Sequence, residues 1–66
     1  MAEQDADPMR KLRHDLSNPL AAILAETQLL LLNEASLDAE TVEGLREIES
    51  VARRMREMLA AIKGPG

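Results

Sequence analysis

The feature that most constrains this chain is the spacing of the seam residues between positions 41 and 62. They recur at alternating steps of four and three: Thr41, Leu45, Ile48, Ala52, Met55, Leu59 and Ile62. This spacing puts them all on one side of an α-helix, because a helix turns once in about 3.6 residues. Val42, Val51 and Met58 widen the seam. Gly44 lies away from it, and the pattern predicts a helix that packs in a bundle.

A second apolar stripe precedes this one. It follows Asp7-Pro8, which favours a helix start because Asp accepts a backbone hydrogen bond and Pro suits the first helical position. The stripe passes through Met9, Leu12, Leu16, Leu20, Ile23, Thr27 and Leu30. Pro19 falls inside it and removes one backbone hydrogen bond. We expect a continuous, kinked helix because the stripe resumes without turn residues, the alternative being a helix that ends at Pro19.

The segment between the stripes has no periodicity and contains Asn, Ser and Asp, which favours a short connection between antiparallel helices. Ser36 and Asp38 are both candidates to cap the second helix. The predicted parts are a disordered acidic tail at 1–7, a helical hairpin at 8–63 and a C-terminal tail at 64–66. Within the hairpin we expect a first helix over about 8–32, a loop at 33–38 and a second helix over about 39–63.

A hairpin of this size buries too little surface to be stable alone. The chain has 66 residues and no Cys, which excludes disulfides and leaves oligomerisation as the stabiliser. One His without Cys does not make a usual zinc site, so we expect no bound metal. Pairing two hairpins about a two-fold axis buries all four stripes. The predicted fold is therefore all-α, an antiparallel two-helix hairpin that homodimerises into a four-helix bundle.

Charge and composition narrow the classes of partner. The formal net charge is −4 and there is no aromatic residue to stack on a base, so we expect no nucleic-acid partner. No apolar run approaches the length of a membrane span, so we expect no membrane insertion by this segment. The acidic N-terminus is unlike a signal peptide, and the absence of Cys fits a cytoplasmic location.

One group of residues on the first helix has chemical potential beyond packing. His14 lies off the apolar stripe, Asp15 follows it, and Asn18 lies one turn further on the same face. Imidazole is nucleophilic at neutral pH, a neighbouring carboxylate can accept the ring proton, and an amide can position a water or a phosphoryl group. A lone His on a charged helix is otherwise simply solvated. The residue types alone leave both interpretations open.

Residues 12–20, Leu-Arg-His-Asp-Leu-Ser-Asn-Pro-Leu, resemble the phosphoacceptor box of two-component sensor histidine kinases, His-(Glu/Asp)-x-x-(Thr/Asn)-Pro-Leu. The determined positions that match are His14, Asp15, Asn18, Pro19 and Leu20. The second helix adds Leu45-x-x-Ile48, Ala52-Arg53-Arg54-Met55 and Leu59, which are similar to that family's second helix. The resemblance covers about residues 9–62 and indicates a dimerisation and histidine phosphotransfer domain.

The resemblance implies a role for each residue of the box. His14 would accept a phosphoryl group from ATP and pass it to a receiver-domain aspartate of a response regulator. Asp15 would be the general base for phosphorylation, and Asn18 would position water when the domain dephosphorylates its partner. Pro19 would supply the helix bend near the histidine.

The sequence departs from a complete kinase because it has no phosphate-cradling loop. We therefore expect no cofactor on this chain and no autophosphorylation by it alone. ATP and Mg²⁺ would lie on partner catalytic and receiver domains, with the catalytic domain in the same longer chain or supplied separately. Two alternatives are a structural or adaptor four-helix bundle with a vestigial histidine box, and a membrane-surface hairpin, which the acidic balance disfavours. Arg10, Lys11 and Arg13 either attract phosphate or an acidic receiver surface, or form a solvated face.

Overall fold

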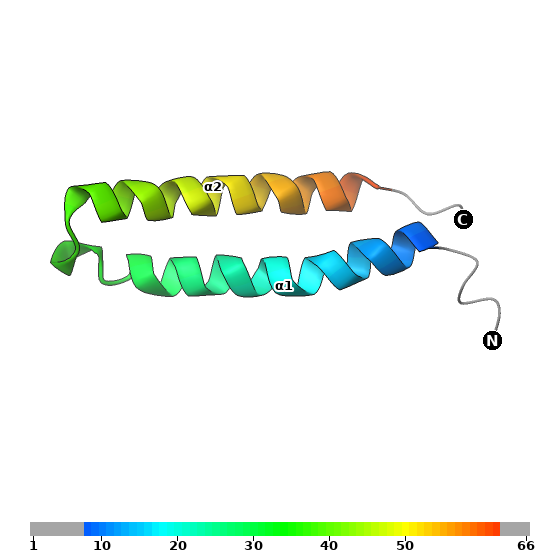
Figure 1. Cartoon of the computed structure of the whole chain (residues 1–66), viewed down its shortest axis with the longest axis horizontal. Coiled ribbons are helices and arrows are strands. Elements are labelled where there is room, and N and C mark those ends of the chain that lie inside the picture. The colour runs from blue at the N-terminus through cyan, green and yellow to red at the C-terminus, as the bar shows by residue number, and fades with distance from the viewer. Residues whose placement is uncertain (1–7, 63–66) are drawn as a thin grey trace.

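In a computed structural model, which describes residues 8–62, the chain forms two antiparallel helices joined by a short connection (Figure 1). Helix α1 spans Pro8–Leu31, the short 3-10 helix η2 spans Glu34–Ser36, and α2 spans Ala39–Ala61. The described residues contain no strand, which confirms the predicted all-α hairpin. Neither helix in this range is long and apolar enough to cross a membrane.

The helix boundaries lie close to those expected from the sequence. Helix α1 begins at Pro8 and ends at Leu31, one residue before the expected end. Helix α2 begins at Ala39 and ends at Ala61, two residues early. The predicted tails, residues 1–7 and 64–66, lie outside the described residues, as does residue 63.

Helix α1 continues through Pro19, so the alternative in which it ends there is wrong. Because Pro19 lacks an N–H, the carbonyl of Asp15 loses its usual partner one turn later. The first turns of α1 tilt toward α2 relative to the rest of the helix (Figure 1). The break in the sequence stripe next to Pro19 therefore corresponds to a bend in an unbroken helix.

Asp38, rather than Ser36, caps α2. The Asp38 Oδ1 accepts a hydrogen bond of 2.7 Å from the backbone N–H of Thr41. The Ser36 hydroxyl instead donates to the carbonyl of Asn33 at 3.0 Å and closes the η2 turn. Hydrogen bonding by the side chain and the backbone of Thr41 lowers the pKa of the Asp38 carboxyl below its ordinary value.

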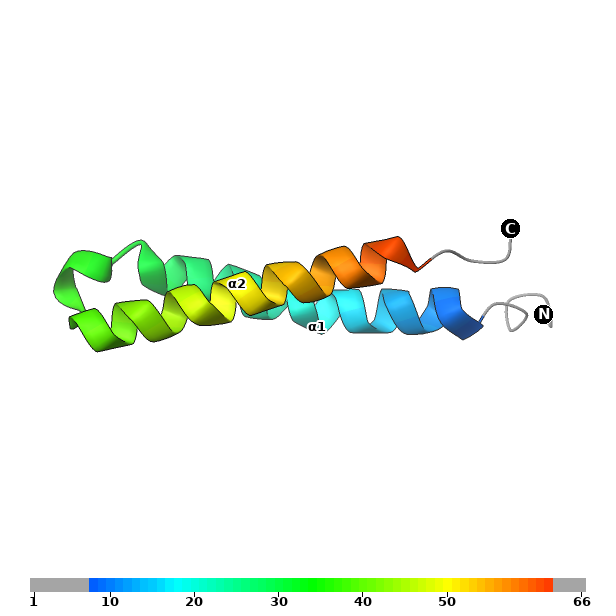
Figure 2. The same ribbon diagram turned by 90° about the horizontal axis from the view of Figure 1, so that it is seen from above.

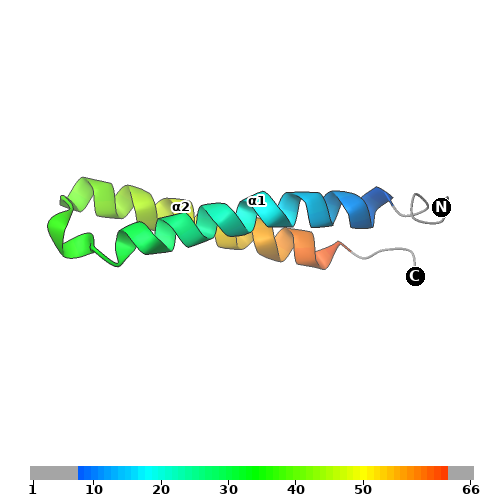
Figure 3. The same ribbon diagram turned by 90° about the horizontal axis from the view of Figure 1, so that it is seen from below.

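The core of the hairpin is small and lies along one line of contact between the helices. Its buried apolar residues are Leu20, Leu24, Ala52 and Leu59, with Ile62 packed against them. Figures 2 and 3 show that α1 and α2 cross at a shallow angle near their midpoints. The small Ala52, 3% exposed, allows the backbones to approach closely. Buried Thr27 satisfies its hydroxyl by donating to the Ile23 carbonyl at 2.7 Å.

The sequence predicts stripes that are too wide for a single hairpin to bury, and several of their residues are exposed here. In the α1 stripe only Leu20 and Thr27 are buried, and they are joined by Leu24, which the stripe omitted. The rest of the apolar stripe is exposed, as are four apolar residues of α2. We call this set the open apolar face: Met9, Leu12, Leu16, Ile23, Leu30, Ile48, Val51, Met55 and Met58. The reason is geometric, because each helix touches its single neighbour along one line and the wider stripe flanks that line.

Candidate functional site

His14 lies in the second turn of α1. The first turns of α1 are at the end of the hairpin opposite the connection (Figure 1). The His14 side chain is exposed. Within the described residues, no hydrogen bond or ion pair engages the imidazole. Both ring nitrogens are therefore available to an incoming reactant.

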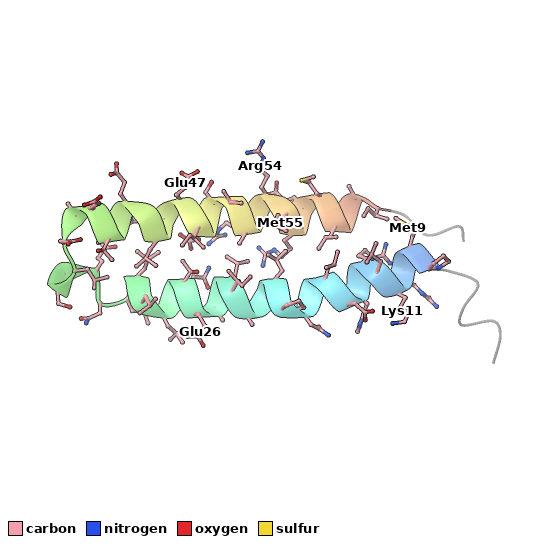
Figure 4. All side chains as sticks on the ribbon, in the orientation of Figure 1. Met9, Lys11, Glu26, Glu47, Arg54 and Met55 are labelled. Atoms are coloured by element: carbon pink, nitrogen blue, oxygen red, sulfur yellow. The ribbon has the colours of Figure 1, made fainter. Side chains whose placement is uncertain are left out.

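Asp15, the predicted general base, has its carboxylate turned to a neighbour other than His14. Its Oδ2 accepts a hydrogen bond of 2.8 Å from the Lys11 ammonium one turn earlier. That hydrogen bond, and the attraction of the Asp15 charge, raise the pKa of Lys11. Lys11 points away from α2 (Figure 4). Both side chains are exposed, so the pair is weak and a change of rotamer can release the carboxylate.

Asn18 and Pro19 complete the predicted site. Both are exposed on α1, Asn18 one turn after His14. No hydrogen bond within the described residues holds the Asn18 amide, so it is open to solvent beside the histidine. Pro19 makes its contribution through the backbone, at the bend described above.

A hollow of about 290 Å³ adjoins His14, and the sequence reasoning did not find it. Its lining residues are Arg10, Arg13, His14, Ser17, Arg56 and Ala60. The Arg13 guanidinium donates to the carbonyl of Ile62 and so ties the last turn of α2 to the histidine turn. The Ser17 hydroxyl donates to the Arg13 carbonyl at 2.7 Å. This basic hollow brings one arginine from α2 to the histidine on α1.

The register of the hairpin explains why Arg56 lies close to His14. In an antiparallel hairpin, residues equally distant from the middle of the connection lie at the same level. His14 and Arg56 are equally far from residue 35, within η2. With the connection at 32–38, the residues between α1 and α2, this relation places Arg56 of α2 near His14.

Charge is segregated along the length of the hairpin. The histidine end, which we define as residues 8–23 and 51–62, carries six basic and two acidic residues. The loop end, residues 24–50, carries one basic and seven acidic residues. Among the described residues, His14 thus lies on the basic end of the hairpin. Such a field attracts anionic reactants.

Comparison with known proteins identifies the family. Residues 9–63 match the family model described as the His Kinase A (phospho-acceptor) domain. Searches of curated proteins and of solved structures gave no match. The family match spans most of the chain, both helices and the whole His14–Leu20 box, and domains of this family typically homodimerise within two-component kinases. The chain therefore belongs to the His Kinase A family, the phosphoacceptor and dimerisation modules of two-component histidine kinases.

Proposed function

We propose that His14 accepts a phosphoryl group from ATP held by a separate catalytic domain and passes it to an aspartate of a response-regulator receiver domain. The observation that carries the proposal is the exposed, unengaged imidazole of His14 within the segment that matches the phosphoacceptor family. ATP and Mg²⁺ belong to the partner domains, and the exchange takes place in the cytoplasm.

The first step is attack by the unprotonated imidazole nitrogen on the γ-phosphorus of ATP. A nitrogen–phosphorus bond forms, the bond to the bridging oxygen breaks, and ADP leaves with that oxygen. The proton on the other ring nitrogen passes to Asp15 after this carboxylate leaves Lys11. In the second step a receiver carboxylate attacks the same phosphorus, and the imidazole leaves and regains a proton. The exposed Asn18 amide orients water for hydrolysis of the receiver phosphate.

Dimerisation through the open apolar face is the second half of the proposal. Its residues from both helices line one apolar groove of about 300 Å³, formed in part by Ile23, Ile48 and Met55. A second copy supplies a matching face and completes a four-helix bundle. His14 lies two residues from both Leu12 and Leu16, a rotation of about 200° around the helix. The bundle therefore covers the apolar face while His14 stays accessible.

The test is phosphotransfer in vitro. Wild type and His14→Ala are mixed with a histidine-kinase catalytic domain, Mg²⁺ and radiolabelled ATP, and a receiver domain is then added. We expect an acid-labile, base-stable phosphate on wild type alone, followed by its appearance on the receiver. Because His14 is the chain's single histidine, the variant removes every imidazole. Label that persists in His14→Ala, or wild type that stays unlabelled across catalytic domains that label other acceptors, would favour a structural bundle instead.

Within the same assay, Asp15→Asn and Asn18→Ala separate the two supporting roles. Loss of the Asp15 carboxylate should slow labelling of His14 by about 10²-fold or more, the usual contribution of a general base. Loss of the Asn18 amide should leave labelling intact and slow hydrolysis of the receiver phosphate. Equal labelling by wild type and Asp15→Asn would assign the Asp15 carboxylate to its Lys11 pair alone.

A further inference from the structure

We infer that the basic hollow beside His14 is an oxyanion site, in which Arg56 of α2, with Arg10 and Arg13 of α1, holds the oxygens of the phosphoryl group during its transfer to the imidazole. This inference rests on the proposed function of His14. It adds a positioning role for an arginine on the second helix, outside the histidine box.

The lining of the hollow favours an anion. Three of its six lining residues are arginines, one is the histidine, and none is acidic. Two acidic residues, Asp15 and Glu57, are adjacent in sequence to lining residues, but neither lines the hollow, and Asp15 is directed to Lys11. By contrast, the hollow at the loop end mixes Glu34 and Glu43 with Arg46. The described residues that line the histidine hollow thus include cations and no carboxylate, and Arg56 is the one of its three arginines that comes from α2.

The chemistry of the guanidinium group favours phosphoryl oxygens in particular. Its planar fork of N–H donors matches a phosphate edge, and the paired bonds are charge-assisted. Arg13 uses its fork in part on the Ile62 carbonyl, which fixes the guanidinium at the hollow and leaves further donors. Arg56 is exposed and has no hydrogen bond or ion pair within the described residues, so its whole fork is available.

Phosphoramidate tests the site without any protein donor. It is a small anion that phosphorylates imidazole: the ring nitrogen attacks phosphorus, the nitrogen–phosphorus bond of phosphoramidate breaks, and ammonia leaves. The displaced ring proton leaves with it as ammonium, so atoms and charge balance. The single histidine makes the reaction simple to follow, because its two ring C–H protons are the only aromatic side-chain signals in a proton spectrum recorded in D₂O.

The central variant is Arg56→Gln, and the matched control is Arg54→Gln. Arg54 lies on the same helix, and Figure 4 shows it pointing away from α1. Both substitutions remove one positive charge from the histidine end. We expect Arg56→Gln to slow phosphoramidate labelling of His14 by about two- to fivefold, the range of an exposed charged contact, and Arg54→Gln to leave it unchanged. Arg56→Lys should restore part of the rate, since it keeps the charge without the fork.

A second readout uses inorganic phosphate, which binds without reacting. Titrated at constant ionic strength and pH, it should shift the His14 ring signals in wild type and Arg54→Gln, and shift them less in Arg56→Gln. Circular dichroism checks that all variants keep the same helix content. Equal labelling rates and equal phosphate shifts in Arg56→Gln and Arg54→Gln would overturn the inference.

The two proposals fail separately. If phosphoramidate labels wild type in an Arg56-dependent way while no kinase domain does, the oxyanion site stands and the relay role of His14 falls. If kinase domains label His14 while Arg56→Gln behaves as Arg54→Gln in both assays, the relay role stands and the oxyanion site falls.

Discussion

The two ends of this hairpin are stabilised in different ways. At the loop end, polar side chains tie the chain to itself: Gln28 donates to Glu49 across the helices at 3.2 Å, Arg46 pairs with Glu34, and Asp38 caps α2. At the histidine end, the described cross-helix hydrogen bond is the one from Arg13 to the Ile62 carbonyl. Most of the open apolar face, from Met9 to Ile23 and from Val51 to Met58, also lies there.

This difference bears on the proposed dimer, because hydrogen bonds within one chain stabilise the loop end more than the histidine end. A single hairpin satisfies the polar groups of its connection by its own hydrogen bonds, although Leu29, Leu30, Leu32 and Ile48 are exposed at the loop end as well. The histidine end exposes several large apolar side chains beside a reactive imidazole, and a lone hairpin gains nothing from either. In the proposed dimer a second chain covers these side chains, while the connection holds the two helices in register.

The largest expected effect is on dimerisation at the histidine end, through Met55. This residue is 47% exposed in one hairpin and lies in the apolar groove. Met55→Glu would bury a charge in the proposed dimer interface. We expect the dissociation constant of the dimer to rise by about 100-fold or more, since burying an unpaired charge costs several kcal/mol. Sedimentation equilibrium measures the constant, and circular dichroism across dilutions reports the accompanying loss of helix.

The control for Met55→Glu is Leu32→Glu, the same charge added next to the connection. Leu32 is 83% exposed and lies outside the open apolar face. It should leave the dimer intact. Equal weakening by both variants would mean that charge, not interface position, sets the dimer affinity, and the contrast between the ends would lose its basis.

The fold follows from the sequence because few signals are needed and they agree. Two helical stripes, Asp7-Pro8 before the first and an aperiodic segment between them leave a hairpin as the simple solution. The burial of individual residues is harder to read. The apolar residues of each helix form a band wider than its line of contact with the other helix. The stripe read from the sequence therefore omits Leu24, which is buried, and includes Ile23, which is exposed in one hairpin.

Part of the candidate site could be predicted from the sequence, and part of it could not. The residues of the box are recognisable because they lie on two consecutive turns of one helix and match a family pattern: His14, Asp15, Asn18 and Pro19. The ion pair between Lys11 and Asp15 depends on side-chain rotamers, which a sequence pattern does not encode. Arg56 lies far from the box in sequence, and only the hairpin register brings it to the histidine.

A smaller effect on stability is expected at the loop end, from substitution of Gly44. It lies in the interior of α2, four and seven residues before Ile48 and Val51. This spacing puts it on the side of the open apolar face, so the expectation that it lies away from the seam is wrong. A Cβ built on it meets nothing within 4 Å. If the position stays open, Gly44→Ala should raise the free energy of unfolding by about 1 kcal/mol per chain, because Ala favours the helix more than Gly does. Urea denaturation followed by circular dichroism measures it, with Ser50→Ala as a control on the same helix. A destabilised Gly44→Ala would reveal a second backbone packed closely on the loop end.

The smallest expected effect concerns the cap of α2 and its dependence on pH. The pKa of Asp38 is lowered in the folded chain by hydrogen bonding from Thr41, so its stabilisation is present above the ordinary carboxyl pKa and is lost as the pH falls through the folded value. The hydrogen bonds from Arg53 and Gln28 lower the pKa of Glu49 and act in the same direction. Between about pH 5 and pH 3 we therefore expect the melting temperature to fall. Asp38→Asn keeps a capping oxygen without a titrating group, so its melting temperature should fall less over this range, whereas Ser36→Ala should follow wild type. If Ser36→Ala flattened the pH dependence and Asp38→Asn did not, the acid sensitivity of the loop end would have its origin outside the α2 cap.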